Sequence, residues 1–129
     1  MNLTIPLDPR TKKNSMQKAK NGGLIQSKAY LQYEKDCKWF VKRLKHPIDY
    51  RVNVKSVYYM KTDYYNGNAT IDLNNLHSAL HDILVKYGVL ADDKCRVIYT
   101  TDGSHVDHDP KNPRTEIFIT AIQEVQDGK

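Results

Sequence analysis

The sequence has no long apolar run, and none of its stretches reaches the roughly 18 consecutive apolar residues that mark a membrane-spanning helix. A protein that spans a membrane through helices is therefore excluded. The first residues, Met1 to Pro6, lack the apolar core of a secretory signal peptide, and we expect a cytoplasmic protein. Internal repeats and low-complexity segments are also absent, so a single globular domain is the expectation for 129 residues.

Cysteine is scarce, and several familiar site patterns are missing. Only Cys37 and Cys95 occur, and their spacing is not that of a zinc site. Because both have apolar neighbours, we predict reduced thiols in the core rather than a disulfide. The sequence has neither a glycine-rich phosphate-binding loop nor a Ser-His-Asp arrangement, so the patterns that mark nucleotide-binding proteins and serine hydrolases are missing.

Basic residues outnumber acidic ones by 20 to 15, and their distribution is uneven. The segment from Arg10 to Lys45 contains eleven Lys or Arg and two acids, which gives it a charge of +9, whereas the rest of the chain carries −4. A basic third beside an acidic remainder favours a protein that binds phosphates with one part and a metal ion with another. The alternative is a surface whose charges serve only solubility.

The first half of the sequence predicts a strand, a basic loop and a helix. Residues 2–6 have the pattern of a short strand, and residues 10–26 predict a mobile basic loop that can close around a phosphate backbone. Ser27 is a suitable N-cap for a helix that continues to about Lys45. That helix would bury one apolar stripe, formed by Tyr30, Tyr33, Cys37, Phe40, Val41 and Leu44.

The second half predicts a strand, another helix and two final strands. Residues 51–61 are rich in β-branched and aromatic types, and Val52, Val54, Tyr58 and Met60 fall on one face at period two, which is typical of a central strand. Asn74 or Asn75 can cap a second helix, and Gly88 is a suitable C-terminal cap. The buried stripe of this helix would be Leu76, Ala79, Leu80, Ile83, Leu84 and Tyr87, and the final strands would lie at about 95–101 and 115–122. The expected fold is α+β, one domain over residues 1–129 in the order β-α-β-α-β-β, with a mixed sheet packed by two helices.

Acidic residues flank the second predicted helix, with Asp72 before it and Asp92 and Asp93 after it. Alone, Asp72 would be interpreted as a helix cap and the aspartate pair as a turn. Together they can supply the several carboxylate oxygens that a hard cation such as Mg²⁺ requires. The helix would be roughly 18–20 Å long, whereas the four extended residues after Gly88 reach at most about 14 Å. Convergence within one chain is possible but tight, and otherwise requires a bent helix or a partner subunit.

Other side chains of this region have alternative interpretations. Asp82 shares a helix flank with Ser78, so it is either a group near the same cation or a solvated acid. His77 and His81 have the i, i+4 spacing of zinc ligands but lack the Glu after the first His, and we interpret them as a solvated helix face. The stretch His105–Asp109 lies between two predicted strands and is interpreted as a surface loop.

The stretch from Asp72 to Asp93 resembles the signature of the RusA family, whose members are Holliday junction resolvases common in prophages. The family pattern is an Asp-x-Asp-Asn-Leu start, an amphipathic helix that contains an Asp, a Gly and an Asp-Asp pair. The matching segments are Asp72-Leu73-Asn74-Asn75-Leu76, Ala79-Leu80-His81-Asp82-Ile83-Leu84 and Gly88-Val89-Leu90-Ala91-Asp92-Asp93. Near the N-terminus, Pro6 and Lys12-Lys13-Asn14-Ser15 are similar to the family's opening strand and polar loop.

The resemblance implies a crossover junction endodeoxyribonuclease that acts in DNA recombination and repair. It implies a homodimer that binds branched, four-way DNA, depends on Mg²⁺ or Mn²⁺ and nicks two strands symmetrically, and a phage or prophage origin in a bacterial host cell. The catalytic and metal-binding residues that it implies are Asp72, Asn74, Asp92 and Asp93. The residues of the basic loop that would bind the DNA backbone are Lys12, Lys13, Asn14, Lys18 and Lys20.

Two positions depart from the family pattern. Asn74 stands where the pattern has its second Asp, and a neutral amide oxygen binds a metal ion less strongly than a carboxylate. Ser78 stands where a lysine is expected, one turn into the helix. These departures keep two alternatives open: a catalytically impaired module that binds junctions or other DNA, and a structural phage protein whose basic charge is incidental.

Overall fold

The computed structural model describes residues 1–12, 16–18, 24–26, 28–66 and 70–123. Their elements are, in chain order, β1 (Asn2–Ile5), β2 (Met16–Lys18), β3 (Leu24–Gln26), α1 (Lys28–Cys37), β4 (Val52–Met60), α2 (Leu73–Lys86), β5 (Ile98–Thr100), β6 (His105–His108) and β7 (Arg114–Ala121). No helix in this described part is both long and apolar enough to cross a membrane.

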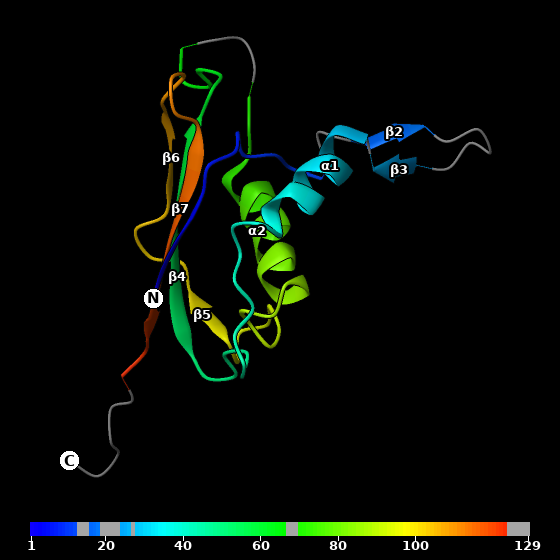
Figure 1. The fold of residues 1–129 in the computed structure, drawn as a ribbon. Helices are drawn as coiled ribbons and strands as arrows, with labels where there is room; N and C mark the ends of the chain where they lie inside the picture. The colour runs from blue at the N-terminus through cyan, green and yellow to red at the C-terminus, as the bar shows by residue number, and fades with distance from the viewer. Residues whose placement is uncertain (13–15, 19–23, 27, 67–69, 124–129) are drawn as a thin grey trace.

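Strand β4 is the centre of the main sheet. It pairs antiparallel with β7, which in turn pairs antiparallel with β1. On its other side β4 pairs parallel with β5 and, further along, with β6. Parallel neighbours need a crossover connection, and α2 is the crossover between β4 and β5. Both helices lie on the same side of the sheet (Figure 1). This mixed sheet packed by two helices confirms the predicted α+β fold class.

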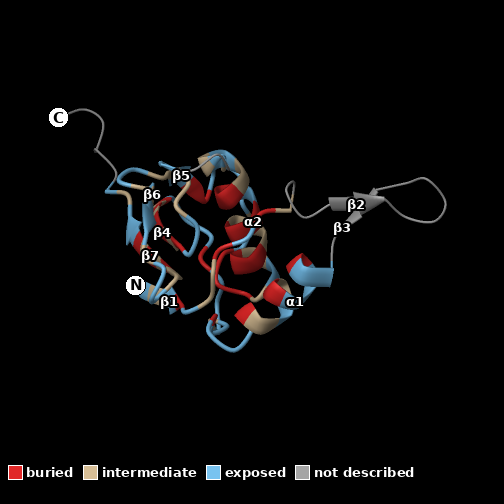
Figure 2. Ribbon diagram, turned by 90° about the horizontal axis from the view of Figure 1, so that it is seen from above, coloured by how far each residue is buried: buried red, intermediate tan, exposed pale blue. Residues whose placement is uncertain are grey.

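The core lies between α2 and one face of β4, and Figure 2 shows the buried residues of both elements facing each other. Side chains of a strand alternate between its two faces, and the face of β4 toward α2 consists of Val52, Val54, Tyr58 and Met60. The buried stripe of α2 consists of Leu76, Ala79, Leu80, Ile83 and Leu84. Both patterns are those predicted from the spacing of apolar residues, although Tyr87 is only half-buried.

Helix α1 is shorter than predicted. It ends at Cys37, and the prediction that it continues to Lys45 is wrong. The amide of Leu44 donates to the carbonyl oxygen of Gly88 at 3.1 Å, so this part of the chain bonds to the segment after α2 instead of continuing the helix. Val41 is buried beside it. The competing partner is remote in the sequence, and local apolar spacing therefore does not reveal where α1 ends.

Short strands form in two segments that the sequence predicts as loops, so that prediction is wrong at both places. Within residues 10–26, strands β2 and β3 pair antiparallel with each other. Residues His105–His108 form the edge strand β6, which pairs with β4 through its backbone. The side chains of β6 are mostly exposed, so it has no buried face to produce an apolar alternation. The mobility predicted for residues 10–26 stays a prediction.

The two cysteines have different surroundings. Cys37 is buried, as predicted, whereas Cys95 is exposed, so the prediction of a core thiol is wrong for Cys95. It lies in the turn between α2 and β5, where its neighbours Lys94 and Arg96 are also exposed.

Gly88 ends α2 in the predicted left-handed cap, with φ +80°. The amide of Val89 donates to the carbonyl oxygen of Leu84 at 2.9 Å, and that of Gly88 to Val85 at 3.1 Å. These bonds satisfy carbonyl groups that the helix leaves unpaired. A Cβ atom added at Gly88 would stand 2.8 Å from Cγ of Arg43.

We expect Gly88→Ala to lower the free energy of unfolding by about 1–2 kcal/mol, because an L side chain is strained in the left-handed region. Urea unfolding followed by circular dichroism measures the loss. Gly88→Asn adds the same Cβ but is better tolerated at positive φ, so it should lose less. If Gly88→Ala is as stable as the unchanged protein, the cap does not require glycine.

Candidate functional site on helix α2

Asp72 is the N-cap of α2, and the prediction of Asn74 or Asn75 at that position is wrong. Its backbone is extended, with φ −104° and ψ 124°, and its Oδ1 accepts a hydrogen bond from the amide of Asn74 at 2.8 Å. The carboxylate thereby satisfies an unpaired amide and lies at the positive end of the helix dipole. Since the cap uses only Oδ1, the other oxygen can bind a cation.

Asp92 and Asp93 follow the opposite end of α2, and they differ in their contacts. Oδ1 of Asp92 accepts a hydrogen bond from the amide of Lys94 at 2.9 Å, and its Oδ2 forms an ion pair with Arg96. Both oxygens of Asp92 are therefore engaged within the turn. Asp93 is exposed, which makes it the better candidate for a cation ligand.

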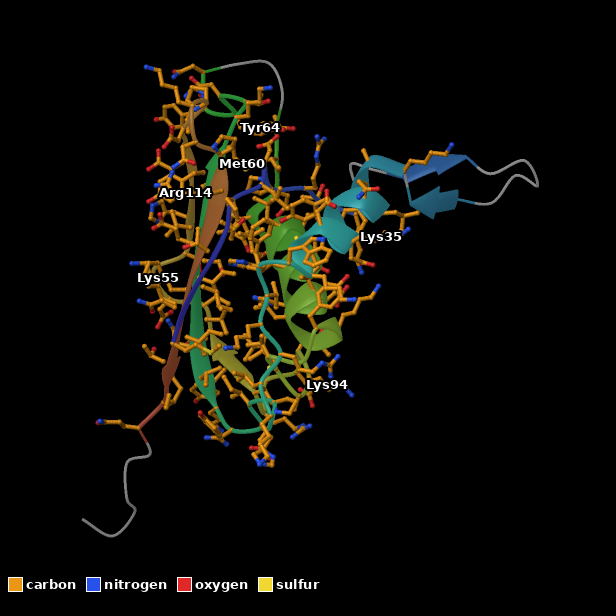
Figure 3. All side chains as sticks on the ribbon, viewed as in Figure 1. Lys35, Lys55, Met60, Tyr64, Lys94 and Arg114 are labelled. Carbon is orange, nitrogen blue, oxygen red and sulfur yellow. The ribbon has the colours of Figure 1, made fainter. Side chains whose placement is uncertain are left out.

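The two groups of acids do not meet within one chain. The 14 residues of α2 extend for about 21 Å. Asp72 and the exposed Asn74 lie at one end, while Lys94, next to Asp93, lies beyond the other end (Figure 3). Among the described residues, no three His, Cys, Asp or Glu side chains gather closely enough to hold one ion. A site that unites both ends therefore requires a second chain.

Asp82, in the middle of α2, forms an ion pair with Lys12. Asp82 thus has a partner within the chain while its side chain remains 40% exposed, and its role near a cation stays a prediction. Both side chains are partly exposed, and such pairs contribute little to stability because water screens them. The contact places Lys12, near the start of the basic segment, against α2, and the neighbouring Thr11 is buried.

The other residues predicted to bind DNA lie mostly outside the described part of the chain. Lys13, Asn14 and Lys20 are not among the described residues, and Lys18 is described only as part of the backbone of β2. Their contacts with DNA stay a prediction.

His77 and His81 pack inside the protein, so the interpretation of a solvated histidine face is wrong. His77 is buried and its Nδ1 lies 2.7 Å from the hydroxyl oxygen of Tyr58 on β4. The rings of His77 and His81 stack at 5.2 Å with an interplanar angle of 9°. Burial lowers the pKa of both imidazoles, and that of His81 falls to about 4. Both rings border the apolar stripe of α2. A prediction that counted the helix positions flanking this stripe as buried would have included both histidines.

The family model described as Endodeoxyribonuclease RusA matches residues 6–120. The match includes β2 to β6, both helices and nearly all of β7. It therefore includes both segments that carry the resemblance, 6–15 and 72–93, together with the chain between and after them. No curated protein matches the chain.

The buried histidines predict a fold that loses stability in acid. Their folded-state pKa values lie below the usual 6.5, so the stability is fully present above that value and declines as the pH falls toward 4. For His81 alone, the free energy of unfolding should drop by about 2 kcal/mol between pH 7 and pH 5. Urea unfolding at the two pH values measures the drop. His81→Gln, which cannot titrate, should show a smaller drop, and an equal drop in both proteins would contradict the assignment.

Proposed function

The chain belongs to the RusA family of endodeoxyribonucleases, and from this membership we propose that it resolves four-way DNA junctions with a divalent cation. The observation that carries the proposal is the placement of oxygen-bearing side chains at both ends of α2. Asp72 and Asn74 lie at one end, and Asp93 follows the other, beside the turn that Asp92 stabilises.

The chemistry of these side chains suits Mg²⁺ or Mn²⁺, which prefer carboxylate and amide oxygens. When bound, such a cation would activate the attacking water and stabilise negative charge on the phosphate oxygens. Asp72 and Asp93 would be the principal ligands, helped by Asn74. Asp92 would act mainly through the turn that it holds, because both of its oxygens already have partners within the chain.

A homodimer would unite the two halves of the site. If two copies of α2 run antiparallel across a twofold axis, the start of one helix lies beside the end of the other. Asp72 and Asn74 of one copy then face Asp93 of the second copy, and the symmetry generates two such sites. Two equivalent sites suit a four-way junction, in which two strands of like polarity are cut. The expected products are a 5′-phosphate and a 3′-hydroxyl, which can be ligated.

The basic segment would bind the DNA backbone. Its charge of +9 suits a polyanion, and its start is held against α2 by the contact between Lys12 and Asp82. Lys12 is then an anchor as well as a candidate contact, whereas Lys13, Asn14, Lys18 and Lys20 follow it along the chain.

We expect Asp72→Asn and Asp93→Asn each to slow nicking of a synthetic four-way junction by about 100-fold or more, because each removes a charged oxygen ligand. Asn is also a good N-cap, so Asp72→Asn should fold normally. Nicking in Mg²⁺ is measured on a denaturing gel, and binding is measured separately in EDTA. Both variants should still bind the junction.

The matched control for this comparison is Asp102→Asn. Asp102 is an exposed acid in the turn between β5 and β6, and its replacement should leave nicking unchanged. Junction binding without nicking in Mg²⁺ or Mn²⁺, and without any gain from Asn74→Asp, would contradict the proposal. That result would instead support a DNA-binding module without catalysis.

A mixture of the two inactive variants tests whether the site is shared between chains. In a mixed dimer, one site combines both replaced residues and the other combines the intact Asp72 and Asp93. Mixing Asp72→Asn with Asp93→Asn should therefore restore nicking to about a quarter of the original rate, with cuts in one strand only. If the acids act within one chain, the mixture stays inactive.

A further inference from the structure

The turn after α1 carries an aromatic side chain that the fold does not bury. Trp39 is 81% exposed, and Phe40 next to it is 39% exposed. Trp39 is the only tryptophan of the sequence. Large aromatic side chains supply the most apolar area for a core, and adjacent exposed ones indicate a surface that is covered by a partner.

The turn that presents Trp39 is held on both sides. The amide of Trp39 donates to the carbonyl oxygen of Asp36 at 3.2 Å, and the amide of Val41 donates to the carbonyl oxygen of Cys37 at 3.0 Å. Val41 itself is buried, so the backbone directly after the aromatic pair is anchored in the core. The backbone that carries the exposed Trp39 ring is therefore fixed in position.

Cations surround this aromatic pair. A surface pocket of about 480 Å³ is lined by Trp39 and Phe40 together with Lys38, Lys42 and Arg43, and none of the described residues that line it is acidic. We call these five residues the Trp39 patch. An aromatic face among three cations suits a ligand that combines a flat ring with negative charge.

Nucleic acid fits the Trp39 patch better than a second copy of the chain does. Across a twofold axis the same patch would meet itself, so three cations on each side would repel one another. In a DNA duplex the faces of the bases are covered by their stacked neighbours. An aromatic ring can reach a base face without forcing the stack apart only where the stack is already open, as in a single strand or at a branch point.

We propose that the Trp39 patch binds an unstacked base of DNA, with Trp39 stacked on the base and the cations on the flanking phosphates. The proposal rests on the proposed function, because branched DNA supplies such bases. The patch also borders the end of α2. Tyr87, at the end of α2, lines the same pocket, and the side chain of Arg43 fills the space where a Cβ of residue 88 would stand; from Gly88 the chain continues to Asp92 and Asp93.

Fluorescence tests the proposal directly, because the indole signal comes from Trp39 alone. In EDTA, where cleavage is prevented, a single-stranded oligothymidylate and a junction with unpaired central bases should quench this signal. A duplex of the same length should not. Trp39→Ala should weaken binding of the first two DNAs by roughly 5- to 150-fold, and that of the duplex by less than about twofold. Trp39→Phe, which keeps an aromatic face, should retain most of the affinity.

Tyr65→Ala is the matched control. Tyr65 is 95% exposed, but its pocket also contains Asp63 and Asp107, so its replacement should change binding by less than about twofold. The proposal is overturned if Trp39→Ala binds single strands as tightly as the unchanged protein, or if it loses equal affinity for all three DNAs. It is also overturned if Trp39→Ala turns a dimer into a monomer in sedimentation, because the patch would then be a contact between copies.

Nicking assays separate this proposal from the proposed function. Quenching by single strands in a protein that never nicks a junction would support the Trp39 patch and contradict the nuclease. Nicking by a protein whose Trp39 signal does not respond to unstacked bases would support the nuclease and overturn the patch.

Discussion

Helix α2 packs on strand β4 through side chains that are almost completely buried, and this contact decides where the candidate functional groups lie. Leu80 and Ile83 on the helix and Val54 on the strand are at most 2% exposed, and their removal from water is the main favourable contribution to such packing. The contact includes one polar pair, in which Tyr58 meets His77 at 2.7 Å. A polar pair inside an apolar interface favours one alignment of helix and strand, because any other leaves buried polar groups without partners.

A helix held along its length in this way also keeps its ends apart. Asp72 caps the start of α2, and Asp92 and Asp93 follow its end, so the acids of one chain are separated by the helix that carries them. The cap gives Asp72 a structural role whether or not a cation is present, since its Oδ1 already accepts the amide of Asn74. The same reasoning applies to Asp92, which holds the turn after the helix. The structural role and the proposed chemistry therefore meet in the same residues. Asp72 caps the helix with Oδ1 and would bind the cation with its other oxygen, whereas Asp92 holds the turn and its neighbour Asp93 would bind the cation.

The parts of the fold that could be predicted are those encoded by neighbouring residues. The alternation of β4, the stripe of α2 and the cap at Gly88 each follow from local spacing and were confirmed. The end of α1 could not be predicted in this way, because it depends on a bond between Leu44 and the distant Gly88. Strand β6 has an almost fully polar sequence and is stabilised by backbone pairing, which leaves no pattern in the side chains.

The acids of the candidate site can be picked out in the sequence, but their arrangement in space cannot. Its acids stand out by their positions around one helix, whereas their distance depends on how straight and how firmly packed that helix is. The burial of His77 likewise depends on Tyr58 of β4, and a helix considered alone does not reveal that partner. The proposed sharing of the site between two copies would be harder still to predict, because the sequence of one chain contains both halves and gives no sign of which copy each half serves.

The early end of α1 connects the fold with the surface proposed to bind DNA. In a longer helix, Phe40 would lie on the buried stripe with Cys37 and Leu44, and Trp39 would stand alone on the opposite side. Because the helix stops, Phe40 turns outward and joins Trp39 in one patch. The bond from Leu44 to Gly88 that replaces the helix also ties this patch to the end of α2. One backbone hydrogen bond thus connects the segment that follows the aromatic patch with the end of α2, from which the chain continues to Asp92 and Asp93.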